Sequence, residues 1–243
     1  MTRALIVVPT YNEAENIPVL IQRIFALDFS EYQVAPEILV VDDSSPDGTA
    51  DRVQTIQKND TRVHLLSRPG KQGLGKAYVA GFSWALERGY EYILEMDADL
   101  SHDPSYLKDM FRLIRDNDLV IGSRYINGVN VINWPLKRLL ISYFGNMYAR
   151  MVTGMPIMDA TAGYKCFRRS VLSSMDLTKV SASGYSFQIE MNYRTWLKKF
   201  RIIETPIIFY DRTVGYSKMS TNIIREGLLL VWKLRIKHFF GKI

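Results

Sequence analysis

Short apolar runs that end in acidic or turn-forming residues recur along the first half of this chain and restrict its fold. Such runs, rich in Val, Ile and Leu, cover residues 4–9, 38–41, 63–66, 92–96 and 119–121. Continuous apolar runs are typical of strands that are buried on both faces of a parallel sheet. Helical patterns separate them, so the sequence predicts an α/β fold with a mostly parallel, doubly wound sheet.

The alternation stops after residue 124. Apolar side chains recur at helical spacing over residues 134–152, and another long helical pattern begins near residue 221. For residues 134–152 the default interpretation is packing against the core, and the alternative is a helix that lies on a membrane. Residues 163–167 and 201–210 are predicted strands, with a helix over 187–197 between them. Pro206 predicts an edge position or a bend for the last strand.

Two acids, Asp97 and Asp99, follow the fourth apolar run. Residues at i and i+2 of an extended chain point to the same side, so both carboxylates can converge on one hard divalent cation. Asp42, Asp43 and Glu13 follow two other runs. The carboxyl ends of parallel strands form one edge of the sheet, where ligands bind in such folds. The sequence therefore predicts a site for Mg²⁺ or Mn²⁺ at this edge.

Helix capping is the alternative interpretation of these acids. It is strong for Asp47 and Asp103, which stand next to turn formers or Pro. It explains paired acids less well, because one cap needs only one acceptor.

The net charge of +6 is distributed unevenly. Residues 212–243 carry seven Lys or Arg and one acid, whereas residues 1–211 are balanced, and residues 119–158 contain no acid. Such asymmetry favours an anionic partner, either a phosphate-bearing ligand or a membrane surface; an ordinary solvated basic face is the alternative. No apolar run approaches the roughly 20 residues that span a bilayer.

The expected location is cytoplasmic and peripheral to the membrane. Cys166 is the single cysteine and has no partner for an internal disulfide, and the first residues lack the pattern of a secretory signal.

Several longer motifs make a family resemblance specific. The chain resembles family 2 glycosyltransferases, and within them the dolichol-phosphate and polyprenol-phosphate mannosyltransferases. The motifs that carry this resemblance are Val8-Pro-Thr-Tyr-Asn-Glu13, Val41-Asp-Asp-Ser-Ser-Pro-Asp-Gly-Thr49, Gly73-Leu-Gly75, Met96-Asp-Ala-Asp-Leu-Ser-His102, Ile121-Gly-Ser-Arg-Tyr125, Asn133-Trp-Pro135, Gly184-Tyr-Ser-Phe-Gln-Ile-Glu190 and Gly215-Tyr-Ser-Lys218.

The resemblance implies a glycosyltransferase A-type fold that forms a single domain over residues 1–243. Residues 1–125 would form the nucleotide-sugar and metal half, and residues 126–243 the acceptor and membrane-facing half. The implied donor is GDP-mannose. Its implied contacts are Pro9, Tyr11, Glu13, Asp43, the nearby Asp42 and the main chain of Ala98.

The implied metal ligands are Asp97 and Asp99. Ser101 stands where some relatives have Gln, so it is a doubtful third ligand that water would replace. His102 is expected to be a surface or capping histidine rather than a ligand.

The implied lipid-phosphate residues are Arg124 and Arg138, because a guanidinium grips phosphate with two parallel hydrogen bonds. Asp97, Asp99 and Arg124 would form the catalytic set. Arg212 and Lys218 are expected as further phosphate contacts on the donor side. Ser186 stands where some relatives carry Lys.

The implied reaction is an inverting displacement at the anomeric carbon of mannose by an oxygen of a polyprenyl or dolichyl phosphate, which gives a β-linked product. The acceptor phosphate is already ionised near neutral pH, so a strong protein base is not required. The helical segments over 134–152 and 221–240 would rest on the cytoplasmic leaflet, alone or with a small membrane-anchoring partner. No nucleic-acid partner is expected.

Other activities share parts of this pattern. A polyprenyl-phosphate glycosyltransferase that uses a UDP-sugar such as UDP-glucose would share every catalytic feature. A processive polysaccharide synthase should have a Gln-X-X-Arg-Trp motif, and a sugar-nucleotide pyrophosphorylase should have a glycine-rich loop after the first strand; this sequence has neither. A catalytically inactive membrane-binding subunit would leave the acid set unexplained.

Overall fold

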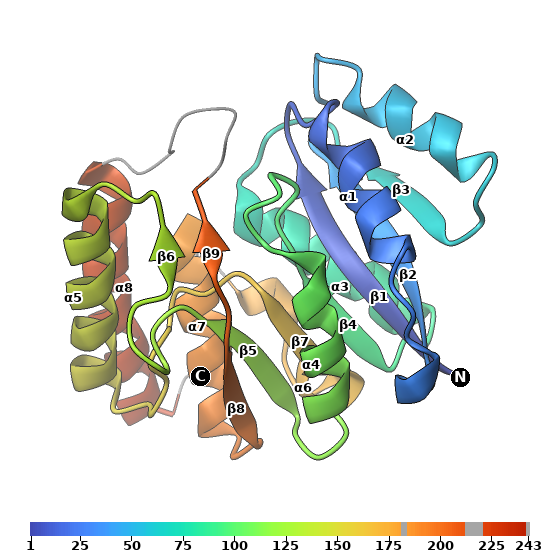
Figure 1. Ribbon diagram of the computed structural model, residues 1–243. Helices are drawn as coiled ribbons and strands as arrows, with labels where there is room; N and C mark the ends of the chain where they lie inside the picture. Colours follow the sequence, from blue (N-terminus) through green and yellow to red (C-terminus); the bar gives the residue numbers. More distant parts are fainter. Residues whose placement is uncertain (181–183, 212–220, 242–243) are drawn as a thin grey trace.

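A seven-stranded sheet forms the centre of the computed structural model, which describes residues 1–180, 184–211 and 221–241 (Figure 1). Its strand order is β3-β2-β1-β4-β7-β5-β8, and only β7 runs antiparallel to its neighbours. The prediction of a mostly parallel sheet is confirmed. The strands are β1 (Thr2–Thr10), β2 (Val34–Asp42), β3 (Val63–Ser67), β4 (Tyr92–Glu95), β5 (Leu119–Ser123), β7 (Lys165–Arg168) and β8 (Ile202–Pro206).

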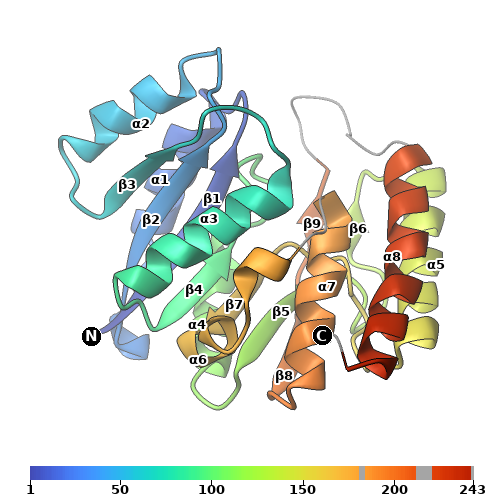
Figure 2. The same ribbon diagram turned by 180° about the vertical axis from the view of Figure 1, so that it is seen from behind.

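Helices cover both faces of this sheet, as doubly wound folds require. One face carries α1 (Asn16–Phe25), α2 (Thr49–Gln57) and α4 (Leu107–Leu113). The other face, seen in Figure 2, carries α3 (Leu74–Glu87), α6 (Arg169–Ser173) and α7 (Gly184–Leu197). Short 3-10 turns add η1 (Ser30–Tyr32), η2 (Pro104–Tyr106) and η3 (Leu177–Lys179).

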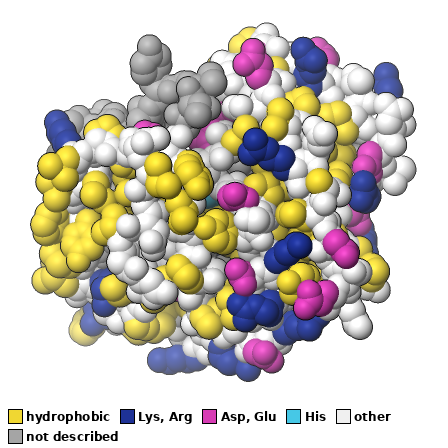
Figure 3. Space-filling model, viewed as in Figure 1, with side chains coloured by type: hydrophobic (Ala, Val, Ile, Leu, Met, Phe, Trp, Pro, Cys, Tyr) yellow, Lys and Arg dark blue, Asp and Glu magenta, His cyan; other side chains and the backbone are white. Residues whose placement is uncertain are grey.

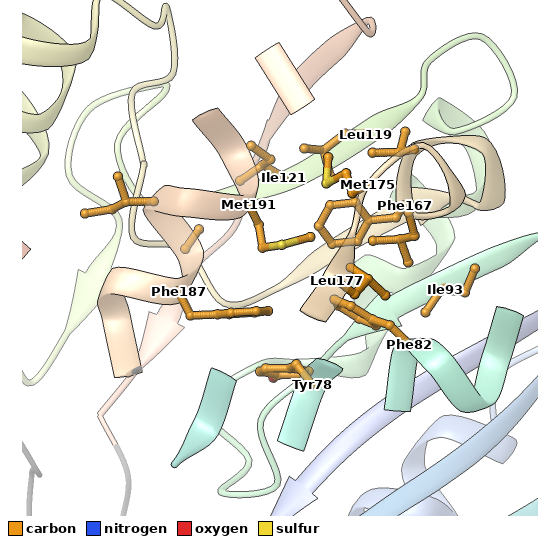
Figure 4. Close-up of a cluster of buried hydrophobic side chains, with 14 of the residues drawn as sticks. Tyr78, Phe82, Ile93, Leu119, Ile121, Phe167, Met175, Leu177, Phe187 and Met191 are labelled. Atoms are coloured by element: carbon orange, nitrogen blue, oxygen red, sulfur yellow. The ribbon is translucent and has the colours of Figure 1, made fainter. Parts of the chain in front are cut away.

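Stacked aromatic rings fix α7 against α3 and the sheet (Figure 4). The ring of Phe187 lies parallel to that of Tyr78, with centroids 5.8 Å apart, and Phe82 meets Phe167 of β7 edge-on at 5.7 Å. All four side chains are buried. Offset and edge-on ring pairs add stability beyond the area they bury. The first turns of α7 are therefore held rigidly beside the end of β4.

The predicted strand over 201–210 is divided at its proline. β8 ends at Pro206 and is the edge strand of the large sheet. After a bend, β9 (Phe209–Tyr210) pairs in parallel with β6 (Val131–Ile132). Both the edge position and the bend predicted from Pro206 are found.

Two long helices, α5 (Leu136–Thr153) and α8 (Thr221–Phe239), lie side by side beyond the sheet (Figures 1 and 2). The default interpretation of the α5 stripe, packing against the core, is wrong for most of its residues, although Tyr148 and Val152 pack partly against the core. Its fully buried residues are the small or polar Asn146, Ala149 and Thr153. Large side chains of the stripe are exposed instead, namely Leu136, Leu140, Tyr143, Phe144, Met147 and Met151.

The inverted burial of α5 has a local cause. Asn146 and Thr153 donate side-chain hydrogen bonds to main-chain carbonyls one turn earlier, and the Asn146 side-chain oxygen accepts from the main-chain N–H of Thr161, so both buried side chains are satisfied. Ala149 lets the helix approach its neighbours closely. Figure 3 shows the hydrophobic side chains that gather over α5 on the outer surface. No helix within the described ranges is both long and apolar enough to cross a membrane.

Candidate active site

A polar pocket lies where β4 ends and α7 begins. Its lining includes both acids of the Asp97-Ala98-Asp99 motif, together with His102, Gly163 and Gln188. The prediction that these two carboxylates share one site is consistent with this geometry. Ala98 between them is buried.

The two carboxylates are positioned by hydroxyl donors. Tyr78 donates to Asp97 at 3.4 Å, and the hydroxyl and main-chain N–H of Ser101 donate to Asp99 at 2.5 and 3.1 Å. Leu100 adopts a left-handed φ of 62°, which turns Ser101 back onto Asp99. Non-glycine residues adopt this conformation at a cost, and such strain is concentrated at functional sites.

This donor set fits a cation that is shared with a substrate. Mg²⁺ in enzymes is commonly held by one or two carboxylates together with substrate phosphates, rather than by a cage of protein ligands. Among the described residues, no group of three or more His, Cys, Asp or Glu side chains forms a metal cage. Asp97 and Asp99 could therefore hold Mg²⁺ or Mn²⁺ against a diphosphate. The Ser101 hydroxyl orients Asp99.

Of the two expectations for His102, a surface position is wrong, whereas a capping role agrees with its hydrogen bond to the main chain. Its side chain is 3% exposed and stacks on Tyr164, with ring centroids 4.7 Å apart. Its Nδ1 accepts a hydrogen bond from the main-chain N–H of Asp97 at 3.1 Å. Burial lowers the pKa of His102 to about 4, so the ring is neutral near pH 7. It holds the turn that carries the two acids.

The acids after β1 and β2 lie at the same sheet edge but outside the lining of the polar pocket. Asp42 is buried and accepts from Thr10 and Ser45, so its carboxylate stabilises the turn. Asp43 pairs with Arg68 at 3.0 Å.

The other predicted nucleotide contacts stand on the first strand and its loop. Pro9 is opposite Val41 in the register of β1 and β2. Glu13 accepts from Asn16 at 2.8 Å, and the Lys71 ammonium lies 4.4 Å from the centre of the Tyr11 ring.

The capping interpretation is confirmed for Asp103, whereas Asp47 stands one residue before Gly48, the N-cap of α2, and binds a main-chain N–H at the start of that helix. Asp47 accepts from the main-chain N–H groups of Thr49 and Ala14. Asp103 caps η2 by accepting from the N–H of Ser105 at 2.8 Å.

The two predicted lipid-phosphate arginines lie together, each beside a carboxylate. Arg124 is buried and donates from Nε and Nη2 to the two oxygens of Asp159 at 2.7 and 2.6 Å. Arg138 donates to Asp211 at 2.6 Å. The Trp134 ring lies 5.4 Å from the Arg124 guanidinium and 4.0 Å from that of Arg138. The ring is therefore near both cations, a favourable cation–π arrangement.

A second pocket, with a mostly apolar lining, opens between α5, α7 and α8. Its walls include Ile141, Tyr148, Ile189, Leu228 and Val231. Ser186 also lines it, and its hydroxyl has no hydrogen-bond partner among the described residues.

The apolar and polar pockets meet at three shared lining residues, Arg124, Arg138 and Thr161. Arg212 and Lys218, along with the Gly215–Lys218 motif, lie outside the described residues.

Several residues of the site were not predicted from sequence. Asp159 and Thr161 bind Arg124 from 35 and 37 residues away. Glu95 and Lys165 are fully buried and face each other across β4 and β7. Charged residues inside apolar runs were the available signal for this pair. Burial raises the pKa of Glu95 to about 7 and lowers that of Lys165 to about 8.

Known proteins resemble this chain in sequence and in fold. The sequence profile of glycosyl transferase family 2 matches residues 5–175. An undecaprenyl-phosphate mannosyltransferase of Micrococcus luteus is 45% identical over 231 residues, which cover 94% of this chain and 92% of that protein. A polyprenol monophosphomannose synthase of Mycolicibacterium smegmatis is 44% identical over 239 residues, covering 96% and 88%.

Solved structures of similar fold include glucosyl-3-phosphoglycerate synthase of Mycobacterium tuberculosis. Its complex with Mn²⁺, UDP and phosphoglyceric acid superimposes with a TM-score of 0.70 at 16% identity, over 96% of this chain and 78% of that chain. The complex with Mg²⁺ and UDP gives 0.69 at 16% identity, over 96% and 79%.

Proposed function

This chain belongs to glycosyl transferase family 2, and we propose that it transfers mannose from GDP-mannose to the phosphate of a polyprenyl or dolichyl phosphate. The fold is of the glycosyltransferase A type. The observation that carries the proposal is the junction of two unlike pockets at Arg124 and Arg138. A polar pocket with two carboxylates suits a metal-bound diphosphate, and an apolar pocket suits a prenyl chain. The two guanidiniums line both pockets, so the acceptor phosphate would bind between them.

The residues of the polar pocket and of the adjoining edge of the sheet would position the donor. A bound divalent cation, Mg²⁺ or Mn²⁺, would neutralise the negative charge that develops on the leaving diphosphate. Asp97 and Asp99 would hold that cation. Pro9, Tyr11, Glu13, Asp43 and Ala98 would contact the nucleotide, with Asp42 supporting their loop. In this proposal residues 1–125 form the donor half of a single domain, and residues 126–243 the acceptor half.

The acceptor would be its own nucleophile. An oxygen of the polyprenyl phosphate forms the new bond to the anomeric carbon while the bond from that carbon to GDP breaks, which inverts the configuration to the β-linked product. Both substrates are anionic and repel each other, so Arg124 and Arg138 would lower the cost of bringing them together. Thr161 and Asp159 keep the Arg124 guanidinium in a fixed orientation. Arg212 and Lys218 are proposed as further phosphate contacts.

A donor panel tests the proposal. Purified protein is incubated with polyprenyl phosphate, Mg²⁺ or Mn²⁺, and radiolabelled GDP-mannose, UDP-glucose and other nucleotide sugars. Transfer from GDP-mannose into a lipid product is expected. Transfer from UDP-glucose alone would mean that the donor is UDP-glucose and not GDP-mannose. The absence of transfer from every nucleotide sugar would favour an inactive membrane-binding subunit.

Arg138 provides a test of the acceptor site. Arg138→Ala removes a charge-assisted contact with the acceptor phosphate, which is worth about 1.5–3 kcal/mol. The KM for polyprenyl phosphate should rise roughly tenfold or more, while the KM for GDP-mannose changes little. Lys137→Ala, which removes an equal charge from an exposed neighbour on the same helix, serves as control. A defect confined to the donor KM would contradict this role for Arg138.

The exposed faces of α5 and α8 are proposed to seat the enzyme on the cytoplasmic leaflet. Both helices present large apolar side chains outward, and α8 adds Leu229, Trp232, Ile236 and Phe239. The apolar pocket opens between these helices, so a prenyl chain would pass from the pocket into lipid without crossing water. The basic residues of α8 would contact anionic headgroups.

Substitution of this face should release the enzyme from lipid. We expect Phe144→Ser combined with Trp232→Ser to weaken binding to anionic phospholipid vesicles roughly a hundredfold, because two exposed aromatic side chains no longer enter the bilayer. Co-sedimentation measures the effect. Val19→Ser, which alters an exposed apolar residue on α1, is the matched control. Equal co-sedimentation of the double variant and the wild type would argue against this face.

A further inference from the structure

A buried amide group faces the polar pocket from α7. Gln188 is 1% exposed and lines the pocket together with both metal-site acids. A Cβ added at Gly163 would lie 3.6 Å from Gln188 Nε2 and 3.9 Å from Asp97 Oδ2. Both side chains therefore border the same small space above Gly163. A group bound at Asp97 comes within reach of the amide.

Lys165 fixes the orientation of that amide. Its ammonium is fully buried and donates to the Gln188 side-chain oxygen, and also to the Gln188 main-chain carbonyl at 3.3 Å. A lysine ammonium has only donors, so it must face the oxygen of the amide and not its NH₂. The Nε2 end of Gln188 consequently points away from Lys165.

Gln188 Nε2 has no hydrogen-bond partner among the described residues, although it is buried. Glu95 is a candidate acceptor, because a hydrogen bond from the Gln188 side chain lowers its pKa against the larger effect of burial, although neither Glu95 oxygen is well placed for that bond. An amide nitrogen carries two hydrogens, so at least one is available to the pocket even if Glu95 takes the other. Buried donors without a partner are rare and call for an explanation.

We propose that Gln188 is a specificity residue whose Nε2 donates a hydrogen bond to a hydroxyl oxygen of the donor's hexose, and that Lys165 is its positioning residue. The inference rests on the proposed function, because it places the diphosphate at Asp97 and Asp99 and the sugar beside them. A neutral amide suits a neutral hydroxyl, while the charged groups of the pocket serve the phosphates. The site would thereby recognise the sugar through contacts that are separate from its contacts with the nucleotide.

The experiment compares the affinities of GDP and GDP-mannose in the presence of Mg²⁺, by titration calorimetry of the whole protein without acceptor. Gln188→Met removes the donor group at similar size. Gln188→Glu also removes it but keeps an oxygen for Lys165, so that the buried ammonium retains its partner. In both variants the ratio of the GDP Kd to the GDP-mannose Kd should fall roughly tenfold from the wild-type ratio. An unchanged ratio in the two folded variants overturns the proposal.

Deoxy sugars identify the hydroxyl. In the wild type, one of the 2-, 3-, 4- or 6-deoxy analogues of GDP-mannose should bind roughly tenfold more weakly than GDP-mannose. In Gln188→Met that same analogue should bind as GDP-mannose does. Equal wild-type affinity for all four analogues would also overturn the proposal, and this result does not depend on any variant folding.

Lys165→Met tests the positioning role. The Kd ratio should fall in this variant, and adding Lys165→Met to Gln188→Met should lower it no further, because both changes act on one hydrogen bond. Independent, additive losses would assign Lys165 a merely structural role. If the wild type transfers mannose while the Kd ratio is unaffected by every variant, this inference fails and the proposed function stands. If the donor panel identifies another nucleotide sugar, the same series is run with that sugar and its nucleotide.

Discussion

Asp99→Ala is expected to lower kcat at least a thousandfold while the fold is retained. Asp99 shares the polar pocket with Asp97 and, in the proposed reaction, holds the cation that neutralises the leaving diphosphate. Loss of about 4 kcal/mol of transition-state stabilisation corresponds to roughly a thousandfold in rate. The measurement is mannosyl transfer at saturating substrates, with far-UV circular dichroism to verify folding.

Two further variants make the Asp99 result specific. Asp99→Asn keeps an oxygen that accepts from Ser101, so the turn is preserved while the charge is lost, and a similar loss of activity is expected. Asp103→Ala removes an acid four residues away that only caps η2. It should cost about 1 kcal/mol of stability and leave kcat unchanged. Full activity of Asp99→Ala would contradict the proposal that Asp99 holds the metal ion.

The sheet was predictable from sequence because strands that are buried on both faces consist almost entirely of apolar residues. Apolar runs marked β1 to β5, and the acids at their ends marked the edge where the pocket lies. The direction of β7 could not be predicted, because a buried antiparallel strand has the same composition as a buried parallel one. β6, with two residues, was too short to be recognised.

Periodicity identified α5 as a helix but not the direction in which its apolar stripe faces. A stripe directed at a protein core and one directed at a membrane have the same spacing. The distinction depends on what packs against the opposite side. Thr153 carried a clue, because its hydroxyl can donate to a carbonyl of the same helix and thus be buried, whereas Asn146 also depends on a bond from Thr161 outside the helix.

Contacts distant in sequence account for the rest of the site. Arg124 was predicted from a motif, but its ion pair with Asp159 joins residues 35 apart. Gln188 and Lys165 are likewise brought together only by the packing of α7 on the sheet. His102 was expected to be a surface or capping residue; its burial against Tyr164, which lies 62 residues away, could not be predicted from the local sequence.

The Arg124–Asp159 pair provides the largest expected effect on stability. Asp159 is fully buried and accepts from the Arg124 side chain at two oxygens, and from its main-chain N–H at 2.9 Å. Asp159→Ala leaves a buried guanidinium without this counter-charge. Breaking one side of a buried ion pair costs about 3–5 kcal/mol, because the desolvated charge loses its compensation. Urea denaturation should show a loss of this size in the free energy of unfolding.

A second substitution separates charge burial from loss of packing. Arg124→Met added to Asp159→Ala removes the buried charge itself, so at least half of the lost stability should return. Asp109→Ala, which breaks the exposed pair with Arg112, is the control and should cost less than about 1 kcal/mol. If Asp159→Ala is no more damaging than this control, the pair does not hold Arg124 in place, and the guanidinium must be positioned for the acceptor phosphate by its other neighbours.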